Sequence, residues 1–136
     1  MAPIRGHLDE YHQPRVAITV RGSRRDLTLD VVIDTGFDGQ LCLPVPLAIE
    51  IGLELYGAQQ TELADGSIKS ELVFLGRAGF IGRSSQEVEI LLTESGDALL
   101  GVGFLLDWRL EIDFSQGIVQ IHPKTRKGKK KSGSLG

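Results

Sequence analysis

The sequence predicts an all-β protein formed by one domain. Its 136 residues include 17 glycines and 5 prolines, a content that favours a turn-rich β fold over a helical bundle. Apolar and polar residues alternate along residues 15–20 and 27–33, as they do in strands with one buried face. The pair Asp65-Gly66 is a typical turn sequence between two hairpin strands. A chain of this length is long enough to bury a substantial core.

The first two predicted strands are joined by a turn at Gly22-Ser23. The second strand becomes apolar on both faces from Val31 to Ile33, which is typical of a strand that enters the core. Residues 40–43 predict a short strand that ends at Pro44. Residues 46–52 predict a short helix, because a proline begins the segment and a glycine ends it.

The second half of the chain is expected to form further strands around one hairpin turn. Asp65-Gly66 favours a two-residue turn with positive φ, and we expect breaks or bulges at Gly76, Gly79 and Gly82. The predicted elements, in order, are strands over 68–80 and 88–92, an apolar run over 98–101, one or two helical turns over 104–108, and a closing hairpin of 110–114 and 118–121.

Charge and polarity divide the chain into three parts. Residues 1–13 are polar and mixed in charge, so we interpret them as an N-terminal extension, followed by a domain over 14–123. Residues 124–136 hold six of the 15 basic residues and no acidic one, so residues 1–123 carry 9 − 18 = −9. This basic tail is expected to be disordered. A basic tail can bind nucleic acid, but the acidic domain argues against nucleic acid as a partner.

The sequence contains no segment of about 18 consecutive apolar residues, the length that a membrane-spanning helix needs. The N-terminus does not have the pattern of a secretory signal, and the single Cys42 cannot form an internal disulfide. We therefore expect a cytoplasmic protein that does not bind a membrane. His7, His12 and His122 lack metal-ligand spacing, so we expect no metal and no cofactor.

The apolar run from Val31 to Ile33 leads directly into Asp34-Thr35-Gly36, a triplet that occurs once in the chain. An unpaired carboxylate at the end of a buried strand is unfavourable by several kcal/mol, roughly, so Asp34 needs a partner. A second carboxylate would allow the pair to activate water. Since each chain supplies one such strand, the second carboxylate would come from another copy of the chain. The alternative is a structural role in which Asp34 caps a turn.

Three segments together resemble the retropepsin-like aspartic proteases, and the resemblance is strongest to prokaryotic members. These segments are residues 31–36, the hairpin sequence over 63–67, and Leu99-Leu100-Gly101 followed by a short helix and a closing hairpin. The resemblance covers residues 14–122. It implies a closed antiparallel β barrel or sandwich with one or two short helices and an active site at a homodimer interface.

The resemblance also implies a role for individual residues. Asp34 would be catalytic, Thr35 would link the two active-site loops through its hydroxyl, and Gly36 would allow the backbone to approach the substrate. Phe37 and Asp38 would bind substrate, and Asp65, Gly66 and Ser67 would form the tip of a flap over a bound peptide. Leu99, Leu100 and Gly101 would support the active-site loop from beneath. Two positions depart from the retroviral branch: Phe37 replaces a small residue, and Val102 replaces a bracing Arg.

The sequence therefore predicts a homodimeric aspartic endopeptidase that hydrolyses peptide bonds in a peptide or protein substrate. The alternative is a catalytically silent module with the same fold that dimerises or binds peptides. The triplet is flanked in the sequence by Ile33 and Phe37. Val102 follows the segment Leu99-Leu100-Gly101, which the resemblance places beneath the active-site loop. If these three residues line the substrate groove, hydrophobic side chains would be preferred beside the cleaved bond.

Overall fold

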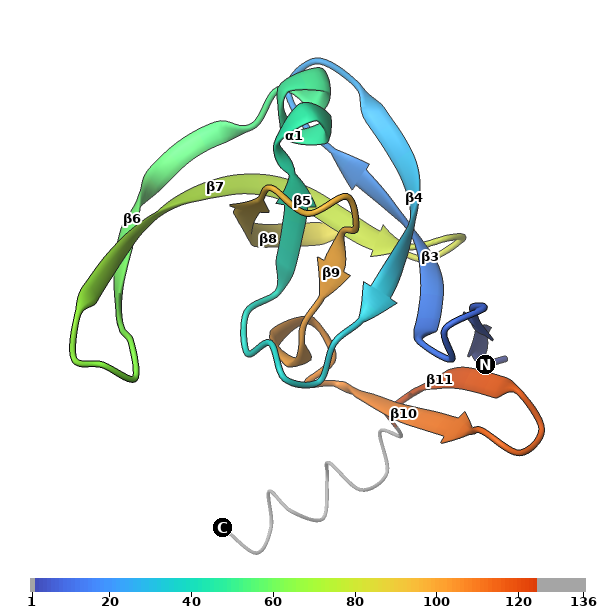
Figure 1. Ribbon diagram of the computed structural model, residues 1–136. Coiled ribbons are helices and arrows are strands. Elements are labelled where there is room, and N and C mark those ends of the chain that lie inside the picture. The colour runs from blue at the N-terminus through green and yellow to red at the C-terminus, as the bar shows by residue number, and fades with distance from the viewer. Residues whose placement is uncertain (1, 125–136) are drawn as a thin grey trace, which may run out of the picture.

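The computed structural model describes residues 2–124 (Figure 1). Predictions for residues 125–136 of the basic tail lie outside this range. In chain order, the elements are β1 (Ile4–Arg5), β2 (His7–Leu8), β3 (Pro14–Arg21), β4 (Asp26–Ile33), β5 (Leu41–Pro44), α1 (Val45–Ile51), β6 (Glu54–Glu62), β7 (Ile68–Phe80), β8 (Gln86–Thr93), β9 (Leu99–Leu100), the 3-10 helix η1 (Val102–Phe104), β10 (Trp108–Asp113) and β11 (Ile118–Pro123). The predicted all-β fold with short helices is confirmed.

The larger sheet is closed into a barrel. Its strand order is β2-β3-β4-β9-β5-β8-β7-β6, and an additional pairing between β3 and β7 joins the two sides. Most pairings are antiparallel, but β4 with β9 and β5 with β8 are parallel. Closure leaves β6 outside the barrel, where it pairs only with the long strand β7. The β6–β7 hairpin therefore projects from the barrel as an arm (Figure 1).

A smaller sheet has the order β1-β11-β10 and lies at one end of the molecule (Figure 1). Within residues 2–124, its β10 strand pairs with β11 on one side only, so the other edge of β10 has no partner strand in this part of the chain. Strands β1 and β2, which lie within the predicted N-terminal extension, pair with β11 and β3. These residues are thus hydrogen-bonded to both sheets, while the domain boundary over 14–123 stays a prediction.

The barrel encloses one apolar core. Strand β3 shows the predicted alternation, since Val16, Ile18 and Val20 are buried and the residues between them are more exposed. The Phe80 ring packs edge-on against Phe104 and Trp108, with ring centroids 5.3 Å and 5.0 Å apart. These contacts attach η1 and the start of β10 to the barrel. No helix among residues 2–124 is long and apolar enough to cross a membrane.

Three local predictions are wrong. Leu63 and Ser67 are joined by a backbone hydrogen bond of 2.8 Å, so the hairpin loop has three residues rather than two. Strand β7 runs through Gly76 and Gly79 without a break, and the register shift lies in β6 between Leu55 and Gly57. The predicted break at Gly82 is confirmed, since this residue lies in the turn after β7 with a φ of 79°.

The third difference concerns the helical turn after β9, which spans Val102–Phe104 rather than 104–108. It begins directly after Gly101, whose backbone is extended. Gly52 ends α1 in the left-handed conformation with a φ of 72°, as the sequence predicts.

Candidate active site

Asp34 is the first residue after β4, and its position is fixed by the parallel neighbour β9. The Val32 N–H donates to the carbonyl of Ala98, and the Asp34 N–H donates to the carbonyl of Leu100, each at 2.9 Å. The preceding residue, Ile33, is buried in the barrel. The apolar strand predicted from the sequence therefore ends where Asp34 leaves the core.

The Asp34 carboxylate lies partly exposed at the start of a tight turn. Its Oδ1 accepts a hydrogen bond from the Gly36 N–H at 2.9 Å, and its carbonyl accepts from the Phe37 N–H at 3.1 Å. Its Oδ2 has no hydrogen-bond partner among residues 2–124. Thr35 and Gly36 are exposed beside it. The turn thus presents one fixed and one available carboxylate oxygen at the surface.

The loop that follows is held against the segment after β9 by three backbone hydrogen bonds. They run from Val102 N–H to Phe37 carbonyl at 2.9 Å, from Gly103 N–H to Gly39 carbonyl at 3.0 Å, and from Gly101 N–H to Gln40 carbonyl at 3.0 Å. Together with the bond from Asp34 to Leu100, they make Leu99–Gly103 a rigid support for residues 34–40.

Glycine at position 101 is required by this close approach. A Cβ atom at Gly101 would lie 2.2 Å from the Gly39 carbonyl oxygen and 2.6 Å from the Phe37 ring. A Cβ at Gly39 would also lie 2.6 Å from the same ring. The half-buried Phe37 therefore packs over two glycines, and this packing accounts for its burial.

The tip of the β6–β7 hairpin contains the other predicted site residues. Asp65 Oδ1 accepts hydrogen bonds from the Ser67 N–H at 2.9 Å and the Ser67 hydroxyl at 2.6 Å. These bonds to Ser67 lower the pKa of Asp65. Gly66 has a φ of 87°. All three residues are exposed, and Figure 1 shows the tip projecting clear of the barrel rather than covering the Asp34 loop.

A hollow of about 520 Å³, which we call the loop hollow, opens beside the Asp34 loop. Asp38, Gly39 and Gln40 line it from that loop, Gln59 from β6, Glu89 and Leu91 from β8, and Gly103 and Leu106 from η1 and the residues after it. Of these, Asp38 was predicted as a site residue. Glu89 and Leu91 lie near this loop because β8 pairs in parallel with β5, a pairing that the sequence pattern does not reveal.

Glu71 lies on β7, close enough to β5 for its charge to affect the thiol of Cys42. Burial and the negative charge of Glu71 raise the pKa of the Cys42 thiol, which lies on β5. Gln59 is the register partner of Glu71 on the neighbouring strand. Since Gln59 lines the loop hollow, the β6–β7 hairpin contributes one wall of it. Among the described residues, no group of three His, Cys, Asp or Glu side chains could hold a metal ion.

Comparison with solved structures identifies the fold. A retropepsin-like aspartic protease from Rickettsia conorii superposes with a TM-score of 0.63 at 13% identity, over 91% of this chain and 94% of that one. The simian foamy virus protease gives a TM-score of 0.51 at 17% identity, over 68% of this chain and 91% of that one. EIAV protease in complex with an inhibitor gives 0.55 at 18%, over 73% and 90%.

No family model and no curated protein sequence matches the chain. The similarity is therefore structural, and the superposition on the Rickettsia protein covers nine-tenths of this chain. The closed barrel, the turn after β4 and its support by the segment after β9 agree with the resemblance drawn from the sequence. The protein has the fold of the retropepsin-like aspartic proteases.

Proposed function

We propose that this protein is an aspartic endopeptidase whose active site forms from Asp34 of two identical chains. The observation that supports this proposal is the placement of Asp34. Its backbone is fixed by β9, and one carboxylate oxygen is available at the surface. All three similar solved structures are named as proteases, and the Rickettsia protein is named as an aspartic protease, which favours peptide hydrolysis over other uses of a carboxylate.

The chemistry requires two carboxylates that share one proton. Two carboxyl groups a few ångströms apart cannot both ionise readily, so one stays protonated at moderate pH. The ionised carboxylate accepts a proton from a bound water as the water oxygen attacks the peptide carbonyl carbon. The protonated carboxyl donates a hydrogen bond to the carbonyl oxygen. The carboxyl that took the water proton then transfers it to the amide nitrogen. The C–N bond breaks to release an amine and a carboxylic acid, without a metal or cofactor.

The second carboxylate would come from a partner chain across a two-fold axis. Thr35 is exposed beside Asp34, and its hydroxyl would bind the backbone of the partner's loop. Leu106, which follows η1, is 77% exposed. The open edge of β10 offers unpaired backbone groups at the same end of the molecule. These three features support a homodimer in which Asp34 of each chain lies near the axis.

The β6–β7 hairpin would act as the flap over a bound peptide. Its outer strand β6 is exposed along most of its length, and its tip is ordered by the Asp65–Ser67 hydrogen bonds. An arm that is anchored in the barrel at one end and free at the other can swing without disturbing the core. Asp65, Gly66 and Ser67 would then contact the substrate backbone.

The test is cleavage of an unstructured protein such as casein by wild type and by Asp34→Asn. The expected result is loss of all cleavage in the variant, because an amide can neither accept the water proton nor share one. Asp26→Asn is the matched control: Asp26 is the first residue of β4, at the end away from the active-site turn, and its ion pair with Arg21 is exposed. A pepstatin-type inhibitor should abolish the wild-type activity.

Oligomeric state must be measured in the same samples. A dimeric wild type that cleaves nothing across about pH 3–7 would contradict the peptidase and favour the alternative, a module that binds peptides without cutting them. Equal cleavage by wild type and Asp34→Asn would show that the chemistry resides elsewhere.

A further inference from the structure

The loop hollow lies close enough to Asp34 to receive a side chain of a peptide bound there. Asp38 is four residues after Asp34, so their Cα atoms are at most about 15 Å apart. An extended peptide advances about 3.3 Å per residue. The hollow can therefore take a side chain within about five residues of the cleaved bond. Its volume of about 520 Å³ lies within the usual range for ligand pockets.

Two carboxylates of the loop hollow have no partner in the described part of the chain. Asp38 and Glu89 make no side-chain hydrogen bond or ion pair there, and no Lys or Arg of residues 2–124 lines the hollow. The Glu89 N–H donates to Gln40 Oε1 at 2.7 Å, which holds the Gln40 amide against β8. The hollow thus combines two negative charges with fixed neutral walls.

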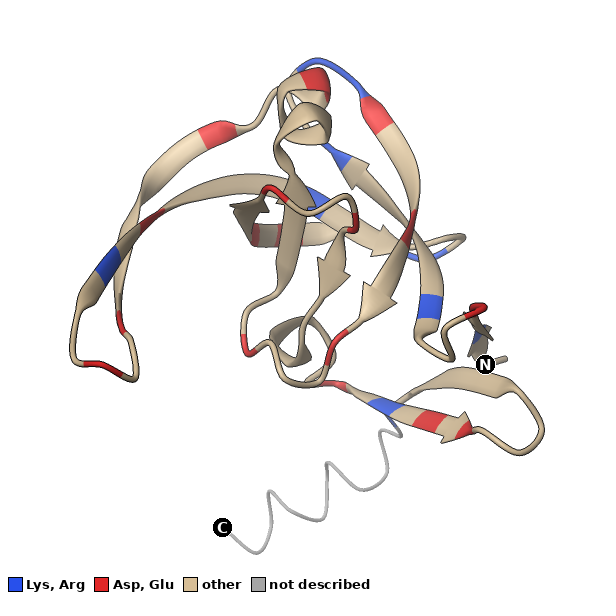
Figure 2. Ribbon diagram, in the orientation of Figure 1, with Lys and Arg blue, Asp and Glu red and all other residues tan. Residues whose placement is uncertain are grey.

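The charge on the elements around the hollow is predominantly negative. Acidic positions outnumber basic ones on the β6–β7 hairpin, as Figure 2 shows along both arms and at the tip. Residues 1–123 hold 18 acidic and nine basic residues. A groove within an acidic surface attracts cationic ligands and excludes anionic ones.

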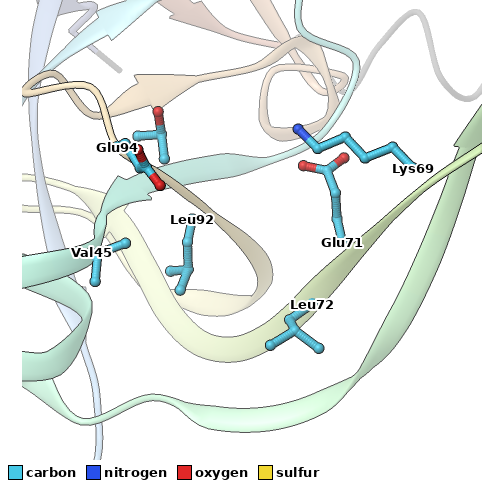
Figure 3. Close-up of a pocket in the computed structure, with 7 residues that line it drawn as sticks. Val45, Lys69, Glu71, Leu72, Leu92 and Glu94 are labelled. Atoms are coloured by element: carbon cyan, nitrogen blue, oxygen red, sulfur yellow. The ribbon is translucent and has the colours of Figure 1, made fainter. Parts of the chain in front are cut away.

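A second hollow, of about 460 Å³ between β7 and β8, has mixed charge instead. Figure 3 shows Lys69 and Glu71 extending from β7, with Glu94 on the segment that faces them. Leu72, Leu92 and Val45 supply apolar walls. Because a cation is already present, this hollow gives no comparable preference for a charged side chain.

We propose that the loop hollow selects a Lys or Arg side chain of the bound peptide, with Asp38 and Glu89 as its charge partners. The inference rests on the proposed function, because it takes the groove beside Asp34 as the substrate groove. Since each chain of a dimer carries one hollow, the preference applies on both sides of the cleaved bond. It differs from the hydrophobic preference expected from the sequence: Ile33 is buried and Phe37 packs over two glycines.

The experiment uses a set of extended peptides in which a single Lys is moved through the five positions on each side of one cleavable bond. Norleucine replaces Lys in the matched set, because it keeps the aliphatic chain without the charge. The ratio of kcat/KM for the Lys peptide to that for its norleucine counterpart should be on the order of fivefold at the favoured position. This ratio should fall when salt is raised, because ions screen an exposed charge pair.

Each substitution in the hollow should change this ratio in a direction set by the charge that it introduces. Glu89→Gln keeps the shape of the side chain and should lower the ratio towards one, and Glu89→Lys should reverse it in favour of a Glu peptide. Glu87→Gln is the matched control, because Glu87 lies on the same strand and is exposed but does not line the hollow. A merely structural role of Glu89 would not produce the reversal.

Binding of fluorescently labelled versions of these peptides to the Asp34→Asn protein separates this inference from the proposed chemistry. If wild type cleaves nothing but the Lys peptide binds Asp34→Asn more tightly than the norleucine peptide, the peptidase proposal fails and the charge preference stands. If cleavage occurs with equal efficiency for both sets, or if Glu87→Gln has the same effect as Glu89→Gln, the preference for a basic side chain is wrong.

Discussion

A single missing side chain allows the support beneath Asp34 to form. Gly101 lies so close to the Gly39 carbonyl that a Cβ atom would overlap it. We predict that Gly101→Ala lowers the free energy of unfolding by about 1–3 kcal/mol, the usual effect of overpacking. Urea denaturation measures this change. Gly96→Ala is the control, because a Cβ there meets nothing within 4 Å; equal effects of the two substitutions would contradict the overlap.

Arg15 connects three segments on the outside of the barrel. Its guanidinium forms ion pairs with Asp9 at 2.7 Å and Asp97 at 3.1 Å. The Arg15 side chain, helped by the Gln13 N–H, lowers the pKa of Asp9 from 3.8 to about 2. A carboxylate whose pKa is lowered in the folded state stabilises the fold at pH values above its unfolded-state pKa. This contribution disappears as the pH falls through the folded-state pKa.

The pH dependence of this contribution gives the second prediction. Asp9→Asn should lower the melting temperature at pH 6, and the difference from wild type should shrink as the pH falls from about 4 to about 2. Melting curves of both proteins over this range provide the measurement. A difference that stays constant with pH would show that the Asp9 charge is unimportant and that only its hydrogen bonds to the Tyr11 and Gln13 N–H groups matter.

At the scale of elements, the β6–β7 hairpin depends on one residue with positive φ. Gly66 has a φ of 87°, and no atom would contact a Cβ there, so a substitution acts through backbone strain alone. Gly66→Ala is expected to lower kcat/KM by roughly fivefold or more, since the left-handed conformation costs about 1–2 kcal/mol with a side chain.

Asn tolerates this conformation better than Ala, so Gly66→Asn should retain most of the activity. Kinetics on one peptide, with unfolding measured in parallel, tests both variants. Identical kinetics for Gly66→Ala and wild type would show that the geometry of the tip does not affect turnover.

The sequence predicted those elements whose signal is local. Alternation identified β3 and β4, and the proline and glycine that bound α1 identified the helix. The three-residue hairpin loop was missed because the Asp65–Ser67 side-chain bonds and the Leu63–Ser67 pairing favour a turn that Asp-Gly alone does not specify. The parallel pairings were missed because they join strands far apart in the chain.

The same contrast, between signals within one segment and contacts between distant segments, decided how much of the candidate site could be predicted. Asp34 and its triplet stand together in the sequence, and the structure places Leu100 and Gly101 against them. Gln59 and Glu89 come from separate strands. Neither has a neighbour in the sequence that marks it as part of a hollow, so the charge preference could be inferred only from the fold.

At the scale of the whole molecule, the proposed site is complete only in a dimer. Specific activity should therefore rise with enzyme concentration until all chains are paired. Adding an equal amount of Asp34→Asn chains should leave about a quarter of the dimers with both carboxylates if chains exchange freely. Peptide cleavage over a dilution series, with sedimentation on the same samples, measures both effects. Full wild-type activity per chain in an exchanged mixture would mean that one chain suffices.

The packing of Phe37 over Gly39 and Gly101 also limits the order in which these positions can change during evolution. The ring lies where a Cβ at either glycine would be, so a larger residue at position 39 is excluded while position 37 is aromatic. At position 101 the Gly39 carbonyl excludes a side chain whatever residue occupies position 37. A lineage could therefore exchange Phe37 for a small residue first and alter position 39 afterwards. The reverse order would pass through an intermediate that cannot pack its active-site loop.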